Sequence, residues 1–199
     1  MDNVLKTEYY DDDIDYQHPL ASESYWESVR FEQCRFEKLD MSEGKWRFCI
    51  FDECEFIDCD LSLLILNNSQ FHSAIFIRCK LLGVDWTQAD WTTHLGKPPK
   101  FKDCILNSGS FFGLALGAIQ LLNCKVHDVD FTESSLVKAR FIGSELNQSR
   151  FYNTTLTSAD FTQAQGYQID VRQNRVDKAR FSRIEALGLL GALGIELVD

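Results

Sequence analysis

The chain has 199 residues, of which 45% are hydrophobic and 25% are charged, and its formal net charge is −10. These values fit one soluble globular domain with a hydrophobic core. The acidic balance argues against a basic nucleic-acid-binding protein, so we expect no direct contact with nucleic acid. The sequence has no secretory signal and no apolar run of about 18 residues, which predicts a cytoplasmic protein without membrane contact.

Residues 1–23 form an acidic N-terminal leader that lacks the pattern of the rest of the chain. Four aspartates, Asp11, Asp12, Asp13 and Asp15, supply much of its charge. The simplest interpretation is a solvated lead-in that becomes ordered near Ser24. The alternative is a cap over the first turn of the structure that follows.

A period of five residues begins after the leader. Large apolar residues stand at every fifth position from Trp26 to Trp91 and, after an interruption at Gly96, from Phe101 to Phe161. A second series lies two positions before the first and contains small or modest residues. It includes all seven cysteines: Cys34, Cys49, Cys54, Cys59, Cys79, Cys104 and Cys124.

This spacing fits neither a helix nor a simple alternating strand. Two inward residues followed by two outward residues predict a three-residue strand and then a corner. Four corners close a square coil of about 20 residues, and stacked coils pair in parallel at about 4.8 Å. We therefore expect an all-β fold over residues 24–181, a right-handed quadrilateral parallel β-helix of about seven coils.

The cysteine spacing argues against zinc, because structural zinc sites typically use cysteines two to four residues apart. We expect buried structural thiols, with a metal site or a regulatory thiol as the alternatives. No histidine has a nucleophile or carboxylate at a triad-like spacing, and no glycine-rich phosphate loop is present. We expect no catalytic, metal or cofactor site.

The interruption near residues 92–100 predicts a loop that leaves the wall of the β-helix. Gly96 replaces a large inward residue, and two prolines remove backbone donors that a sheet interior needs. The loop is either a plain surface insertion or a partner-binding segment. Its residues are Thr92, Thr93, His94, Leu95, Gly96, Lys97, Pro98, Pro99 and Lys100.

Residues 182–199 predict a short C-terminal α-helix and tail. Ser182 and Glu185 match a capping box, and Gly194 fits a helix C-cap. This segment either caps the last coil or both caps it and forms a two-fold homodimer. The candidate dimerisation residues are Ile184, Leu187, Leu190, Leu193, Ile195 and Leu197.

Units such as CRFEK from Cys34, CEFID from Cys54 and ADFTQ from Ala159 resemble the A(D/N)LXX signature of pentapeptide-repeat proteins. The resemblance covers about residues 26–161 and implies the quadrilateral β-helix of that family. The stretch from Tyr167 to Ser182, with the leucines that follow, resembles the C-terminal region of the Qnr-like and AlbG-like topoisomerase-protecting subgroup.

That resemblance implies a non-catalytic, DNA-mimic-like homodimer that binds DNA gyrase, or topoisomerase IV, and protects it from antibiotic poisons such as quinolones or albicidin-type inhibitors. An interaction scaffold with a different protein partner is the alternative. Residues 1–100 carry a net charge of −9, from 19 acids and 10 bases, whereas residues 101–199 carry −1. The candidate acidic surface is either a solvated face or a partner-binding one, and its members are Glu32, Glu37, Asp40, Asp52, Glu53, Glu55, Asp58 and Asp60.

Overall fold

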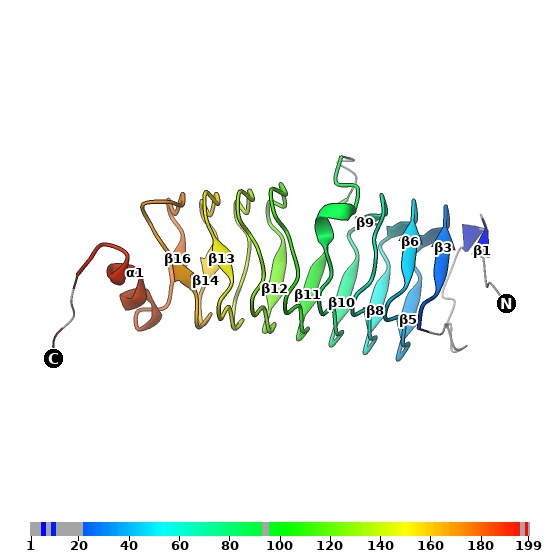
Figure 1. Cartoon of the computed structure of the whole chain (residues 1–199), viewed down its shortest axis with the longest axis horizontal. Helices are drawn as coiled ribbons and strands as arrows, with labels where there is room; N and C mark the ends of the chain where they lie inside the picture. The colour runs from blue at the N-terminus through cyan, green and yellow to red at the C-terminus, as the bar shows by residue number, and fades with distance from the viewer. Residues whose placement is uncertain (1–4, 7–8, 11–21, 93–95, 196–197, 199) are drawn as a thin grey trace.

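The chain winds into a parallel β-solenoid, drawn side-on in Figure 1, with one short helix at its C-terminal end. The computed structural model describes residues 5–6, 9–10, 22–92, 96–195 and 198. The solenoid has about eight turns, one more than the sequence predicts, and it confirms the all-β parallel β-helix. None of the helices in these described ranges has the length and apolar character that a membrane crossing requires.

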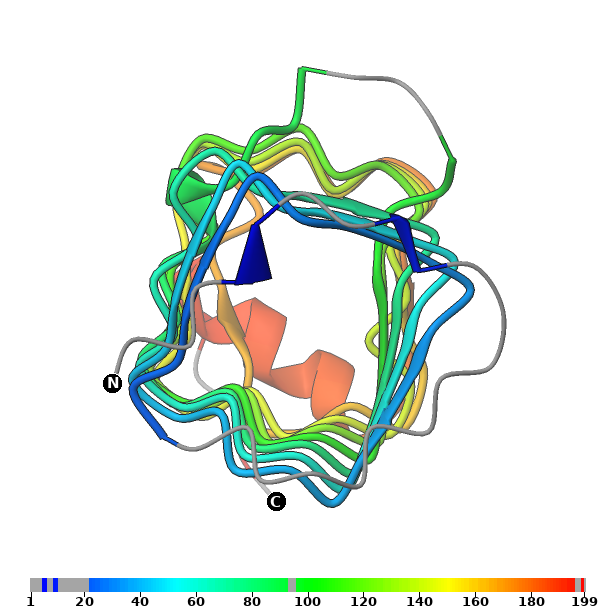
Figure 2. The same cartoon turned by 90° about the vertical axis from the view of Figure 1, so that its right-hand side faces the viewer.

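Each coil runs around four sides, which Figure 2 shows end-on. Side 1 is built from β1 (Leu5–Lys6), β3 (Tyr25–Glu27), β6 (Lys45–Arg47), β13 (Arg150–Phe151) and β15 (Gln168–Ile169). Side 2 contains β2 (Tyr9–Tyr10), β4 (Arg30–Glu32), β7 (Ile50–Asp52) and β9 (Gln70–His72).

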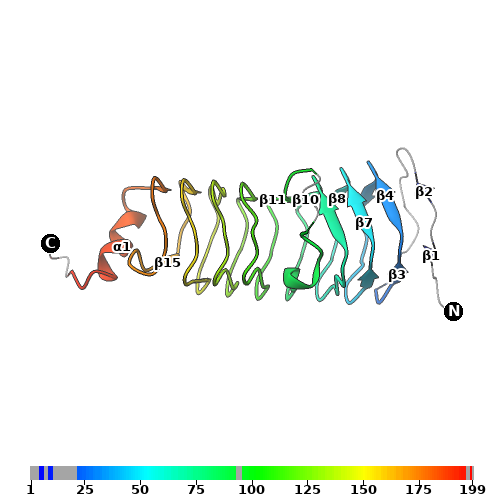
Figure 3. The same cartoon turned by 90° about the horizontal axis from the view of Figure 1, so that it is seen from above.

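Side 3 is the longest column of strands, and Figure 3 shows the stack of coils from above. Its members are β5 (Arg35–Glu37), β8 (Glu55–Ile57), β10 (Ile75–Ile77), β11 (Lys100–Lys102), β12 (Gln120–Leu122), β14 (Asp160–Phe161) and β16 (Arg180–Phe181). Side 4 is joined by single parallel bridges, beginning with Asp40 to Asp60 and Asp60 to Lys80. Two 3-10 turns, η1 (Trp86–Gln88) and η2 (Glu185–Leu187), and the helix α1 (Gly188–Gly191) complete the elements.

The inward residues of side 3 form one column, and we number the coils by them. From coil 1 to coil 8 they are Phe36, Phe56, Phe76, Phe101, Leu121, Phe141, Phe161 and Phe181. The rings of Phe36 and Phe56 stack at 4.8 Å between centroids with planes 10° apart, and Phe141 and Phe161 repeat this geometry. The ring spacing therefore equals the roughly 4.8 Å spacing of paired strands, so side chains and backbone stack in the same register.

The corners use left-handed backbone at nearly every fifth residue, from Glu23 to Lys178. This conformation costs a non-glycine residue roughly 1–2 kcal/mol. The corners are held by bonds to the next coil; for example, the Gln33 amide donates to the Asp52 carbonyl at 2.8 Å. At several corners an aspartate also accepts from the amide two residues on, as Asp40 does from Ser42 at 3.1 Å.

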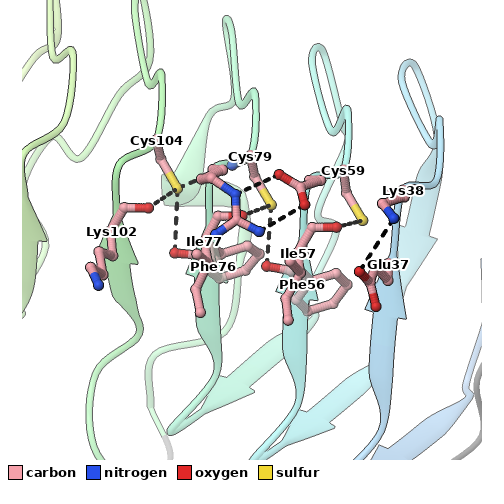
Figure 4. Close-up of polar contacts among 12 residues, drawn as sticks. Glu37, Lys38, Phe56, Ile57, Cys59, Phe76, Ile77, Cys79, Lys102 and Cys104 are labelled. Carbon is pink, nitrogen blue, oxygen red and sulfur yellow. Dashed lines mark hydrogen bonds and ion pairs between the residues drawn. The ribbon is translucent and has the colours of Figure 1, made fainter.

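The narrow inward positions satisfy the backbone between coils. The Cys124 amide donates to the Ser144 hydroxyl at 2.9 Å, and that hydroxyl donates to the Leu121 carbonyl at 2.9 Å. Cysteines in the same column make longer bonds of the same kind, shown in Figure 4, such as Cys104 Sγ to the Phe76 carbonyl at 3.3 Å. Cysteine and serine suit these positions because their side chains fit beside the rings and reach the backbone.

The two ends depart from the regular repeat. In the leader, β1 pairs with β3 and β2 pairs with β4, so backbone pairing begins before residue 24. In the last coil Arg150 pairs with Gln168, whereas a strict repeat would pair it with Asp170. This shift places Ile169 in the column of Phe151 and Tyr167 two residues before it, whereas a strict five-residue count selects Val171 and Ile169 for these two positions.

None of the seven cysteines forms a disulfide with another described residue, and each is buried inside the solenoid with at most 2% exposure. Burial raises the pKa of Cys49 to about 11 and that of Cys54 to about 12. Hydrogen bonding to the thiol of the next coil, together with burial, raises the pKa of Cys79 and Cys104 to about 12. These groups therefore stay protonated and unreactive at neutral pH.

We predict that the folded protein resists thiol modification and loses stability at alkaline pH. An aromatic disulfide reagent at pH 8 should label none of the seven thiols before urea is added and all of them after unfolding. Because thiols ionise near pH 8.5 when unfolded but not when folded, the free energy of unfolding should fall as the pH rises from about 8.5 to 11. Rapid labelling of the native protein at pH 8 would contradict the buried assignment.

Candidate partner-binding site

A loop leaves the solenoid between coil 3 and coil 4, at the protrusion in Figures 1 and 2. Phe76 pairs with Phe56 in the coil before it and with Phe101 in the coil after it. The second interval exceeds the first by one five-residue unit, so the insertion adds one whole repeat and the columns stay in phase. Of the nine predicted loop residues, Thr93, His94 and Leu95 lie outside the described residues.

The predicted C-terminal boundary of the loop is wrong. Lys100 is the first residue of β11 and pairs with Ile75, because the solenoid wall resumes there. Pro99 is buried at the narrow inward position that cysteine fills elsewhere, two residues before Phe101. Proline is tolerated there because its ring fills the narrow space. Of the described residues, Thr92 and Gly96 belong to the insertion, whereas Lys97 and Pro98 occupy the regular corner positions of coil 4.

The entry to the loop is held by polar contacts. Asp90 accepts from the Thr92 hydroxyl at 2.6 Å and from the Gln70 amide nitrogen at 2.7 Å. Hydrogen bonding from Thr92 holds the pKa of Asp90 below its usual value. Trp91, which we expected in the core, is only half-buried, and its indole nitrogen donates to the Trp86 carbonyl at 2.8 Å.

The exit of the loop packs against the wall at Gly96. A Cβ on Gly96 would lie 2.9 Å from Ser73 Oγ and 3.1 Å from the Cβ of His72, and its φ is +73°. The Lys97 amide donates to Ser73 Oγ at 3.0 Å, and the Ser73 amide donates to the Lys97 carbonyl at 2.8 Å. His72, next to the inward Phe71, is 5% exposed at this contact.

Two hollows flank the loop, and both are lined by Lys97 and Pro98. The smaller, about 210 Å³, lies over side 2 between Trp91 and Leu116. The larger, about 690 Å³, lies over the corner between sides 2 and 3, with apolar walls from Ala74, Ile75, Pro98 and Ala118. Sequence reasoning missed these wall residues because they belong to different coils and are far apart in the chain; the coil period is the signal that relates them.

The candidate acidic surface divides into two groups. Five members lie on side 3 or the corner before it, in coils 1 and 2: Glu32, Glu37, Asp52, Glu53 and Glu55. Part of their charge is neutralised within the chain, because Arg30 pairs with Glu32 and, at 3.3 Å, with Asp52. We call these five residues the acidic patch.

The other three members serve the fold. Asp40 and Asp60 accept from the amides of Ser42 and Ser62, both at 3.1 Å, and so close corners. Asp58 receives two bonds of 2.7 Å from Arg78 in the next coil, which hold its pKa below the usual value. These aspartates stabilise coil contacts and add little to a partner surface.

The C-terminal segment differs from the predicted capping box. Ser182 Oγ accepts from the Gln163 amide at 2.7 Å, and no side chain caps η2. The hydroxyl is used to join coils, so the helical segment starts without it. The helix α1 ends at Gly191 with Ala192 as its C-cap, so Gly194 is not the helix cap that we expected. Gly194, with φ of +71°, lies in the turn that follows, where the Ile195 amide donates to the Leu190 carbonyl at 3.4 Å.

The predicted dimerisation stripe is largely exposed on this segment. Ile184 is 80% exposed, Leu187 50% and Leu193 46%, whereas Leu190 is half-buried. Ile195 is also exposed, and Leu197 lies outside the described residues. Leu189, not a predicted member, packs against the solenoid core. The segment thus covers the last coil with one face and leaves an apolar face uncovered.

Within the described ranges, no cluster of three or more His, Cys, Asp or Glu side chains has the arrangement of a metal site. His127 lies beside Glu145, with Nε2 3.1 Å from the carboxylate, on an exposed corner. Its described surroundings hold no nucleophile positioned for catalysis. The features able to recognise a partner are therefore the loop, the two hollows, the acidic patch and the C-terminal apolar face.

We predict that Gly96→Ala lifts the loop exit from the wall. The added Cβ would meet Ser73, and the left-handed backbone would be strained. Hydrogen exchange at the Ser73 amide should accelerate about tenfold, corresponding to a loss of about 1.4 kcal/mol. Gly113→Ala is the matched control, because Gly113 has φ of +68° but no atom within 4 Å of an added Cβ. Equal effects of both changes on Ser73 exchange would refute a specific contact.

We compared the chain with models of known protein families, with curated proteins and with solved structures. The chain matches "Pentapeptide repeat region" over residues 29–111 and "Pentapeptide repeats (8 copies)" over residues 124–164. A search of curated proteins found no match.

Several solved structures share the fold. Full-length QnrB1, described as a plasmid-mediated fluoroquinolone resistance protein, is similar with a TM-score of 0.62 and 20% identity over 92% of this chain and 95% of that one. HetL from the cyanobacterium Nostoc sp. strain PCC 7120, described as involved in heterocyst differentiation regulation, gives 0.62 and 16% over 80% and 79%. Together with the repeat matches, the two-register core shows that this chain belongs to the pentapeptide-repeat family.

Proposed function

We propose that this protein is a non-catalytic factor that binds DNA gyrase, or topoisomerase IV, and protects it from antibiotic poisons such as quinolones or albicidin-type inhibitors. The observation that carries the proposal is the acidic patch on a rigid wall. Enzymes that hold DNA present basic surfaces to its phosphates, so a fixed array of carboxylates is a complementary ligand for them.

The likeness to QnrB1 along nearly the whole of both chains supports the proposal, since that protein is described as a fluoroquinolone resistance protein. The loop beside coil 4 adds a second point of contact. It protrudes from the wall close to the acidic patch, and its two hollows offer shape that a smooth solenoid lacks. The patch supplies charge, and the loop supplies specificity.

A scaffold with a different partner is the second candidate. The specific observation in its favour is the equal similarity to HetL, which is described as involved in the regulation of heterocyst differentiation. The same solenoid thus occurs in proteins with different described roles, and function depends on the surface added to it.

The test is a gyrase supercoiling assay with a fluoroquinolone or an albicidin-type inhibitor. Purified protein should restore supercoiling, and the double substitution Glu53→Lys with Glu55→Lys should reduce this rescue.

Deletion of residues 92–96 tests the loop. It removes the inserted unit and makes this coil as long as the one before it, so the variant should fold. Full rescue by the deletion variant would make the loop a plain insertion. Absence of rescue by the intact protein against every poison would favour the scaffold.

We further propose that the C-terminal apolar face joins two copies in a two-fold homodimer. Ile184, Leu187 and Leu193 expose large side chains next to the end of the solenoid, where a second copy would cover them. Such a contact is isologous, because the same residues meet across the axis. Their burial would add hydrophobic stabilisation of about 25 cal/mol per Å².

The homodimer predicts that Ile184→Glu with Leu187→Glu gives a monomer. Both side chains are exposed in one chain, so the variant should still form the solenoid and keep the circular dichroism spectrum of the original protein. Sedimentation equilibrium should show a mass near twice 22.9 kDa for the original protein and near 22.9 kDa for the variant. Ile184→Val with Leu187→Met is the conservative control and should stay dimeric. A monomeric original protein would contradict the proposal.

A further inference from the structure

Side 3 and the corner before it change sign along the rod. Four outward positions per coil line this surface: the two corner residues and the two residues that flank the inward one. In coils 4 to 8 these positions hold seven bases and two acids, a net charge of +5. The seven bases form what we call the basic strip: Lys97, Lys100, Lys102, Lys138, Arg140, Lys178 and Arg180.

The same positions in coils 1 to 3 hold the five acids of the acidic patch and one base, Arg35, a net charge of −4. The net charge of residues 101–199 is −1, so the total charge of this half of the chain does not indicate the basic strip. Its columns become visible only when residues of successive coils are placed side by side, as in the series Lys100, Gln120, Arg140, Asp160, Arg180.

The lysines of the strip have no ion-pair partner among the described residues. Arg180 pairs with Asp160 at 3.1 Å, but Lys97, Lys100, Lys102, Lys138 and Lys178 form no ion pair with the part of the chain that the structure describes. The acidic patch contrasts with this, because its Glu32, Glu37 and Asp52 have arginine partners. The strip therefore keeps an outward positive charge that an external anion can meet.

Its cations cluster at alternate coils, 4, 6 and 8, because coil 5 offers Gln120 and coil 7 offers Asp160 at the same position. At about 4.8 Å per coil, the clusters are about 10 Å apart and the strip is about 19 Å long. A peptide in the polyproline II conformation has three residues per turn at about 3.1 Å per residue, so every third side chain lies on the same face at nearly this interval. Carboxylates at positions i, i+3 and i+6 would meet the three clusters.

The 690 Å³ hollow lies at the coil 4 end of the strip. Lys97 and Lys100 line it together with Ala74, Ile75 and Ala118, so cationic groups and apolar walls share one site. Glu53 and Gln120 are its other polar walls, with Ser73. A hollow of this size and lining suits one large apolar side chain that enters beside a carboxylate.

We propose that the basic strip and this hollow bind a short acidic protein segment, with an apolar residue in the hollow and carboxylates along coils 4 to 8. A rigid duplex longer than the strip would extend over the acidic patch of the same side and be repelled there. A segment of six to nine residues ends before it. The site shares only Glu53 with the acidic patch, and the peptide assay contains no gyrase, so failure of this proposal and failure of gyrase protection can be told apart.

The test uses a fluorescein-labelled nine-residue peptide with one phenylalanine followed by glutamates at every third position. Fluorescence anisotropy at low salt should show saturable binding that weakens as sodium chloride is added. Lys100→Gln with Lys138→Gln should weaken binding about fivefold, from two exposed charge pairs. Lys45→Gln with Lys125→Gln is the matched control on sides 1 and 4, and it should leave binding unchanged.

A second variant tests the hollow. Gln120→Trp fills it, so this variant should bind the peptide with phenylalanine no more tightly than the same peptide with alanine at that position.

Three results would overturn the proposal. One is equal binding of a peptide in which glutamine replaces every glutamate. Another is an equal loss of affinity in the strip variant and the Lys45 and Lys125 control. The third is tighter binding of a DNA duplex longer than the strip than of the peptide, abolished by the strip variant, which would make the strip a nucleic-acid site. Circular dichroism and thermal unfolding of each variant establish that it is folded, since all the substituted side chains are on the surface.

Discussion

Every feature of this molecule depends on the placement of each residue above its counterpart in the preceding coil. Backbone amides pair between coils in that register, and the rings of Phe36, Phe56 and Phe76 stack over one another because of it. The two contacts have the same spacing, so each supports the other. A single coil is not stable by its local interactions alone. As in other solenoids, the stability of the fold comes from the packing of each coil against the next.

The inward lattice was predictable because a buried column tolerates only a few residue types. The cysteines marked the narrow positions, and the structure buries all seven. The ends were harder. Tyr167 and Ile169 enter the core through a shortened connection that no five-residue count contains. Ser182 was predicted as a helix cap but bonds to Gln163 in the previous coil, since a coil contact outcompetes a local one. The spacing of residues in the sequence predicts contacts that recur in every coil, but it does not predict contacts that occur once, at the ends of the solenoid.

The surface was the least predictable part. Carboxylates that looked equivalent in the sequence have different roles: Asp40 closes a corner, Asp58 is tied to Arg78, and Glu55 belongs to the acidic patch. Neighbours on the surface are a whole coil apart in the sequence, so totals of charge over half-chains mix opposite sides. The reversal of sign along side 3 is visible only in the folded arrangement. Interaction with partners is governed by this local pattern rather than by the net charge.

The insertion between Trp91 and Lys97 lengthens one coil by a single repeat unit without disturbing the coils on either side. An insertion of any other length would have to be absorbed entirely outside the wall, or each following ring would move out of its column. Evolution can therefore alter the protein at low risk in whole repeat units, at corners. The loop can vary in sequence and length while the core keeps its columns. A lineage of such rods could acquire new partners faster than it loses stability.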